Sequence, residues 1–145
     1  MTVAVYRAPM RSRRDDIDIA ATIERALARG LCGLGGPKMP SDERVARRID
    51  RFRHVDDGSF VWTRDADGLY WLGRIVGPYF YDFDDDAAAV DLVHVRECRW
   101  LPEPLLEPAV PAAVLATYRR GGRNFQQTHD STVGAETLRL WDELD

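Results

Sequence analysis

The side chains best suited to bind a ligand are aromatic rings gathered in the middle of the chain. Nine of them fall between residues 60 and 100: Phe60, Trp62, Tyr70, Trp71, Tyr79, Phe80, Tyr81, Phe83 and Trp100. Trp and Tyr combine a flat apolar face with a polar edge, so they are favoured where one edge must stay exposed. Such rings can sandwich a planar base or surround a methylated group. The alternative is that they fill the core of a small sheet.

Arginines form the second candidate set. Arg44, Arg47, Arg48 and Arg51 recur at helical spacing, which places them on one face of a helix. There they could hold the phosphates of a nucleic acid, although a solvated helix face is the alternative. Arg120 and Arg123, around the pair of glycines at 121–122, offer a second contact patch, and Asn124 or Gln126 could reach a base edge.

The charge balance limits how a nucleic acid could be held. The net charge is −4, so the chain is not a generically basic nucleic-acid binder. The charge is uneven, with 13 Lys+Arg against 9 Asp+Glu up to Arg64, and 7 against 15 from there onward. Lys38 is the single lysine. A chain of this charge must gather its arginines on one face to hold nucleic acid.

Spacings typical of catalysis are missing from the sequence. The three histidines, His54, His94 and His129, have no partner at metal-ligand spacing, and no GxSxG, HExxH or P-loop motif occurs. The acidic run 82–86 lacks the glycine and closing glutamate of a calcium loop. We therefore expect a non-enzymatic protein with no metal or cofactor. An RNA-modifying or hydrolytic enzyme is an alternative, and would need Asp82 or His94 in a pocket with a perturbed pKa.

These side chains need a sheet and several helices to position them. Alternation and turn signals predict strands over 3–7, 58–64, 69–76, 79–83 and parts of 90–101, with a break at Gly77-Pro78. Helical periodicity predicts helices over about 17–29, 42–53 and 111–119, and a last helix capped by Asp130. The segment 31–40 is predicted to be a loop, and 84–88 an acidic turn. The pattern favours an α+β fold, a small bent antiparallel β-barrel with flanking helices.

Length and composition fit a single domain over residues 1–145, with its core at about 30–101 and C-terminal helices at 111–145. No apolar run approaches the roughly 20 residues that span a bilayer, and the N-terminus reverses the order of a secretory signal. We expect a cytoplasmic protein without a membrane partner. Cys32 and Cys98 lack metal-ligand spacing and are predicted to be reduced core thiols.

The central stretch also resembles a known family. Residues 70–82 read Y-W-L-G-R-I-V-G-P-Y-F-Y-D, and residues 94–101 read H-V-R-E-C-R-W-L. Both are similar to strands of the PUA-like superfamily, in particular its EVE/YTH-like branch. The glycine-rich segment 30–36 corresponds loosely to a family loop that commonly ends in Trp, where this chain has Gly36. The resemblance covers about residues 30–101.

The resemblance implies a bent barrel that flips a modified DNA or RNA base into an aromatic pocket. Our leading hypothesis is a non-catalytic reader of methylated cytosine in DNA, with a separate effector protein as a possible partner. Its pocket would comprise Trp62, Trp71, Tyr79, Tyr81, Asp82, Gly33, Gly35 and Gly36. Asp82 or a loop carbonyl would accept from an exocyclic amine, and the glycines would admit the base closely. A protein-interaction module without nucleic-acid binding is the alternative.

Overall fold

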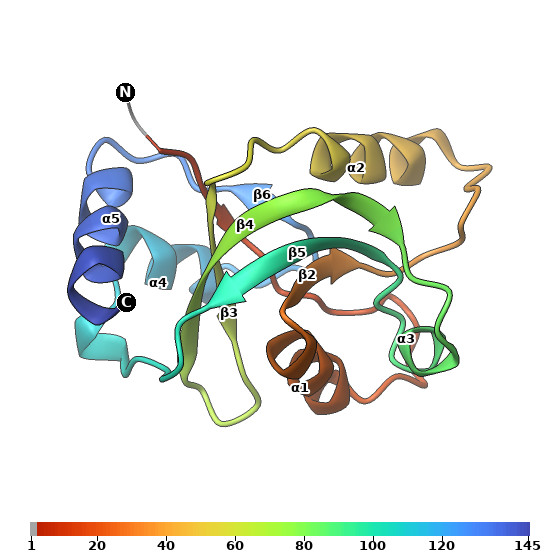
Figure 1. Cartoon of the computed structure of the whole chain (residues 1–145), viewed down its shortest axis with the longest axis horizontal. Coiled ribbons are helices and arrows are strands. Elements are labelled where there is room, and N and C mark those ends of the chain that lie inside the picture. Colours follow the sequence, from red (N-terminus) through yellow and green to blue (C-terminus); the bar gives the residue numbers. More distant parts are fainter. Residues whose placement is uncertain (1–2) are drawn as a thin grey trace.

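One curled sheet organises the fold (Figure 1). The structure is a computed structural model that describes residues 3–145. Within that range the sheet has six strands: β1 (Val5–Arg7), β2 (Leu31–Leu34), β3 (Phe60–Arg64), β4 (Tyr70–Tyr81), β5 (His94–Trp100) and β6 (Gln126–Gln127). Their spatial order is β2-β5-β4-β3-β1-β6. All neighbours are antiparallel except β1 and β3, which run parallel.

The predicted α+β class is confirmed, with two differences. The sheet curls but does not close into a barrel, because β2 and β6 remain its two edges. The prediction of a wholly antiparallel sheet is wrong for β1, which runs parallel to β3 with Val5 opposite Phe60. Parallel pairing requires a long crossover, and here the connection between these strands contains two helices and β2.

Five α-helices surround the sheet in the described part of the chain: α1 (Ile19–Arg29), α2 (Glu43–Arg53), α3 (Asp85–Ala89), α4 (Ala112–Arg119) and α5 (Val133–Leu144). In Figure 1, α4 and α5 lie together at one end, and α1, α2 and α3 lie around the other. Asp18 and Asp42 cap α1 and α2, where each carboxylate accepts from a backbone N–H of the first turn. The acidic stretch forms α3 instead of a turn, because the Asp84 carboxylate accepts from the Asp86 backbone N–H.

Two glycine-containing segments depart from the sequence prediction. Gly77-Pro78 does not break the strand: β4 continues through it with a bulge between Ile75 and Tyr79. Proline is tolerated there because a bulge needs no ladder hydrogen bond at that position. Leu31–Leu34, predicted as loop, pairs with β5 as β2. Gly33 permits this pairing, because a Cβ there would collide with the backbone oxygen of His94.

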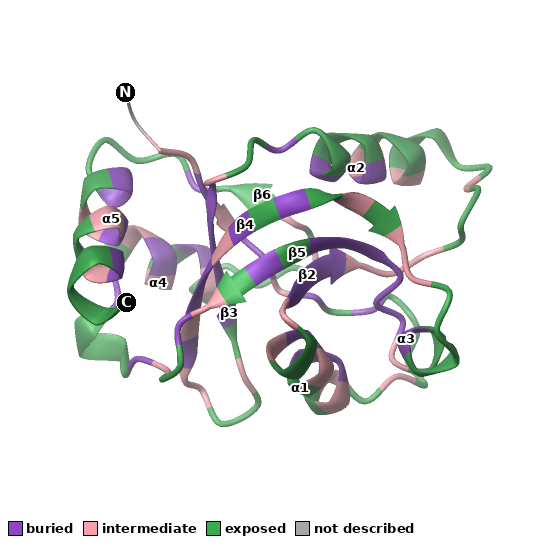
Figure 2. Cartoon of the chain, in the orientation of Figure 1, coloured by how far each residue is buried: buried purple, intermediate pink, exposed green. Residues whose placement is uncertain are grey.

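The two faces of β3 serve two separate cores. Phe60 and Trp62 pack with Trp141 of α5 on one face, whereas Val61 packs with Phe52 of α2 on the other. The predicted alternation of this strand is therefore confirmed, and Figure 2 shows β3 buried along most of its length.

The two cysteines, Cys32 and Cys98, are free and buried, as predicted. Burial raises the pKa of the Cys32 thiol to about 12, which keeps it protonated and unreactive. In residues 3–145 no helix has the length and apolar character needed to cross a membrane.

Candidate functional site

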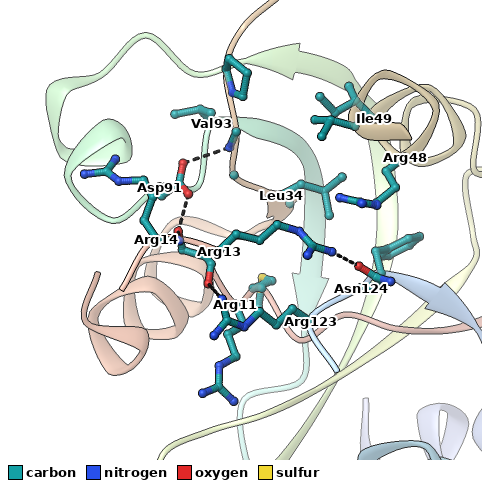
Figure 3. Close-up of a pocket in the computed structure, with 18 of the residues that line it drawn as sticks. Arg11, Arg13, Arg14, Leu34, Arg48, Ile49, Asp91, Val93, Arg123 and Asn124 are labelled. Atoms are coloured by element: carbon teal, nitrogen blue, oxygen red, sulfur yellow. Dashed lines mark hydrogen bonds between the residues drawn. The ribbon is translucent and has the colours of Figure 1, made fainter. Parts of the chain in front are cut away.

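A cavity of about 460 Å³ opens between the end of β2, the loop at residues 10–14 and α2 (Figure 3). Its walls are largely apolar and come from Leu34, Val45, Ile49 and Phe125, with Met10 beside them. Five arginines also line it: Arg11, Arg13, Arg14, Arg48 and Arg123. An apolar cavity bordered by convergent polar groups is the usual form of a small-ligand site.

Tyr81 is the one residue of the four proposed aromatic rings that lines this cavity. Trp62 is fully buried in the core beside α5, and its indole nitrogen donates to Thr137 Oγ1 at 3.4 Å. Trp71 belongs to the β3–β4 hairpin, where its indole nitrogen donates to Asp65 at 2.9 Å. The correction has a simple physical basis: alternation along β3 turns Trp62 to the face covered by α5, away from the cavity.

Tyr79 does not line the cavity and is stacked on His94, with 6.0 Å between ring centroids. Its hydroxyl is 2.7 Å from His94 Nδ1, and His94 Nε2 is 2.9 Å from the Pro37 carbonyl. A carbonyl only accepts, so Nε2 carries the proton and Nδ1 accepts from the tyrosine. Burial lowers the pKa of His94 and favours this neutral form. Both ring nitrogens are therefore occupied, and Nε2 holds Pro37, which does line the cavity.

Asp82 does not line the cavity either. Its carboxylate pairs with Arg25 of α1 at 3.2 Å, and this contact ties the end of β4 to that helix. An enzyme built on Asp82 or His94 therefore has neither side chain available at the cavity.

The glycines of the proposed site do border the cavity, and Asp91 explains their spacing. Gly33, Gly35 and Gly36 all line it. The Asp91 carboxylate accepts from the Gly36 backbone N–H at 3.0 Å and from Ser12 Oγ at 2.5 Å. A Cβ on Gly35 would collide with that carboxylate. Asp91 therefore joins the glycine turn to the loop at residues 10–14, and a larger residue at position 35 would break this junction.

Backbone strain is concentrated at the same place. Met10 and Asp91 have left-handed φ angles of 53° and 50°, and among the described residues no other non-glycine residue has a positive φ. Both line the cavity. Non-glycine residues in this region cost about 1–3 kcal/mol each and cluster at binding and catalytic sites. The strain marks this cavity as the candidate site independently of its shape.

The proposed polar contacts divide between the cavity and the outer surface. Arg48, Arg123 and Asn124 line the cavity. Arg44, Arg47 and Arg51 are exposed on α2 outside it. Arg120 and Gln126 border a separate depression of about 200 Å³, where Gln126 accepts from the buried Arg7 at 3.1 Å.

Sequence reasoning missed the loop that carries Arg11, Arg13 and Arg14. The signal was present as the run M-R-S-R-R at residues 10–14. Arg13 crosses the cavity and donates to the Asn124 side chain (Figure 3). Partial desolvation and the nearby charges of Arg48 and Arg123 lower the pKa of Arg13. The cavity is therefore a concentrated centre of positive charge in a chain of net charge −4.

The fold has counterparts among solved structures. The Pho92 YTH domain, solved in complex with m6A, superposes with a TM-score of 0.53 and 12% identity, covering 99% of this chain and 85% of that one. The YTH domain of the Zygosaccharomyces rouxii MRB1 protein, solved with N6-methyladenosine RNA, gives 0.53 and 12%, covering 95% and 83%. No protein-family model matches the sequence, and neither does any curated protein sequence. The chain thus shares the fold of these YTH domains. The likeness gives no support to the EVE branch in particular.

Proposed function

We propose that this protein is a non-catalytic reader that holds a modified nucleic-acid base in the cavity. The base we propose is an adenine methylated on N6, presented by single-stranded RNA. The observation that carries the proposal is the strained, arginine-bordered cavity in a fold shared with two domains solved in complex with N6-methyladenosine.

The cavity has suitable size and chemistry for a base. Small-ligand sites commonly occupy about 300–1,000 Å³, and this one has about 460 Å³. Leu34 and Ile49 offer apolar contact for a methyl group, and Tyr81 offers a ring for stacking. No tryptophan lines the cavity within residues 3–145. An arginine plane can stack on a base in place of a ring, and Arg13 crosses the cavity (Figure 3).

RNA suits this chain better than the methylated duplex DNA that the sequence favoured. Extracting a base from a duplex costs a few kcal/mol, whereas a single strand presents its bases at lower cost. With a net charge of −4, the chain has little general attraction for a duplex to offset that cost. The two structural neighbours are complexes with N6-methyladenosine, not with methylcytosine. Duplex DNA that contains methylcytosine is therefore the comparison ligand in the binding test.

The direct test is fluorescence anisotropy with matched short oligonucleotides at low and physiological salt. We expect single-stranded RNA containing one N6-methyladenosine to bind about tenfold or more tightly than unmethylated RNA, because a methyl group in an apolar pocket contributes that much. Affinity should fall with salt through the arginines. Equal affinity for both RNAs would contradict the proposal, and tighter binding of methylcytosine duplex DNA would restore the original hypothesis.

A variant that fills the cavity tests whether the methylated RNA binds there. Val45 lines the cavity from α2, whereas Ala46 is exposed next to it and does not. Val45→Trp should abolish preference for the methylated RNA, and Ala46→Trp should leave it intact. If no RNA binds the folded wild-type protein, the protein-interaction module becomes the better hypothesis.

A further inference from the structure

We propose that Arg13, Arg48 and Arg123 form a phosphate site inside the cavity, so that the ligand is a nucleotide bound together with its own phosphate. The chemical class is a nucleoside 5′-monophosphate, either free or at the 5′ end of a strand. The choice of base rests on the proposed function; the phosphate site rests on the three arginines.

The three arginines come from separate parts of the chain and meet at one cavity. Arg13 belongs to the loop at residues 10–14, Arg48 to α2, and Arg123 to the segment that follows α4. In Figure 3, Arg13 and Arg48 extend into the cavity from opposite sides. Arg123 lies below them and donates to the Ser12 carbonyl at a long 3.4 Å. Such convergence is what binding one anion from several directions requires.

These charges are not neutralised by the protein. Within residues 3–145 none of the three arginines has a carboxylate within 4.0 Å, although seven other arginines do. Asp91 is the acidic residue that lines the cavity, and its oxygens already accept from Gly36 and Ser12. Partial desolvation, and then repulsion by the Arg48 and Arg123 charges, lower the pKa of Arg13. A bound anion would relieve that repulsion.

Hydrogen-bond donors are also available. A guanidinium has five N–H donors. In the described part of the chain the Arg48 side chain makes no hydrogen bond to protein, and the Arg13 side chain makes one, to the Asn124 side chain. A phosphate between Arg13 and Arg48 would receive donors from both sides. A phosphate monoester approaches two negative charges at neutral pH, whereas an internal phosphodiester carries one. Three arginines therefore favour the monoester.

Isothermal titration calorimetry with four ligands tests the site: N6-methyladenosine, its 5′-monophosphate, unmethylated AMP and inorganic phosphate. We expect the methylated nucleotide to bind about tenfold or more tightly than its nucleoside, because charge-assisted hydrogen bonds to phosphate are strong. Arg48→Gln should lower nucleotide affinity to the nucleoside level while leaving nucleoside affinity unchanged. Arg44→Gln, on the same helix but outside the cavity, is the matched control.

The outcomes separate the two proposals. If nucleotide and nucleoside bind equally, or if Arg48→Gln and Arg44→Gln behave alike, the phosphate site is refuted. If methylated and unmethylated nucleotides bind equally and both exceed the nucleoside, the phosphate site stands and the modified-base function fails. RNA with N6-methyladenosine at a 5′-phosphorylated end should bind more tightly than RNA with the same base placed internally. The reverse order would contradict the preference for a monoester.

Discussion

The two ends of the curled sheet use side chains in opposite ways. At the end covered by α4 and α5, Trp62, Tyr70 and Trp141 are buried together in one core. At the end near β2, the chain leaves a cavity bordered by glycines and by left-handed Met10 and Asp91. Three of the arginines that line it have no carboxylate within 4.0 Å in residues 3–145. The first end contains most of the buried aromatic rings, and the second contains most of the strain and unbalanced charge.

This difference shows that aromatic density alone does not locate a binding site. Large rings bury the most apolar surface, so a small domain uses them first to build its core. Strain and crowded like charge, by contrast, lower stability and persist only where the rest of the structure compensates. The comparison yields the following predictions, in order of decreasing effect.

Replacing Trp62 should affect stability, not recognition. We expect Trp62→Ala to lower the free energy of unfolding by about 3–5 kcal/mol, because it removes a fully buried ring and leaves a cavity. Urea unfolding followed by circular dichroism measures the loss. A variant that remains as stable as wild type but no longer binds RNA would place Trp62 in the binding site.

Asp91 should affect both stability and recognition. In Asp91→Asn, the amide nitrogen replaces one acceptor and faces either the Ser12 hydroxyl or the Gly36 N–H. We expect a loss of about 1–3 kcal/mol in unfolding free energy and weaker nucleotide binding, because a buried donor loses its acceptor. Asp86→Asn, exposed on α3, should change neither quantity. Identical melting and binding curves for the two variants would rule out the junction role of Asp91.

Tyr81 lines the cavity and Trp71 lies in the β3–β4 hairpin, so removing each ring in turn compares the two locations directly. Tyr81→Leu keeps apolar bulk but removes the ring that lines the cavity, so RNA affinity should fall about tenfold, within the range for loss of one stacking partner. Trp71→Leu should leave affinity unchanged, because Trp71 contacts the hairpin through Asp65. Anisotropy titrations compare the two. A larger binding defect in Trp71→Leu would overturn the placement of the site.

The smallest effect concerns pH. Burial lowers the pKa of His94 in the folded state, so the unfolded chain takes up a proton first as the pH falls. Stability should be full above the ordinary histidine pKa of about 6.5 and decline between that pH and the lower folded value. His94→Gln should flatten this part of the stability profile, whereas His129→Gln, exposed on the surface, should preserve it. An unchanged profile in His94→Gln would contradict the prediction.

Much of the framework could be predicted from local sequence signals. The periodicity of residues 17–29, 42–53 and 111–119 located three helices to within about two residues. Alternation in β3 identified the shared face of Phe60 and Trp62. It could not tell which side of the sheet would be covered by helices, because that depends on packing between distant segments. Of the four rings predicted for the pocket, Tyr81 therefore lines the cavity, whereas Trp62, Trp71 and Tyr79 lie outside it.

The sequence by itself determined the helix spans, most strands, the reduced cysteines and the glycines that border the cavity, because capping, alternation and backbone freedom act over a few residues. Tertiary structure alone decided that β1 runs parallel to β3, that Gly77-Pro78 lies in a bulge and that Arg13, Arg48 and Arg123 meet. The closest two of these arginines are 35 positions apart in the sequence. Their convergence depends on how the curled sheet brings α2 and the two loops together, and no local pattern encodes that distance.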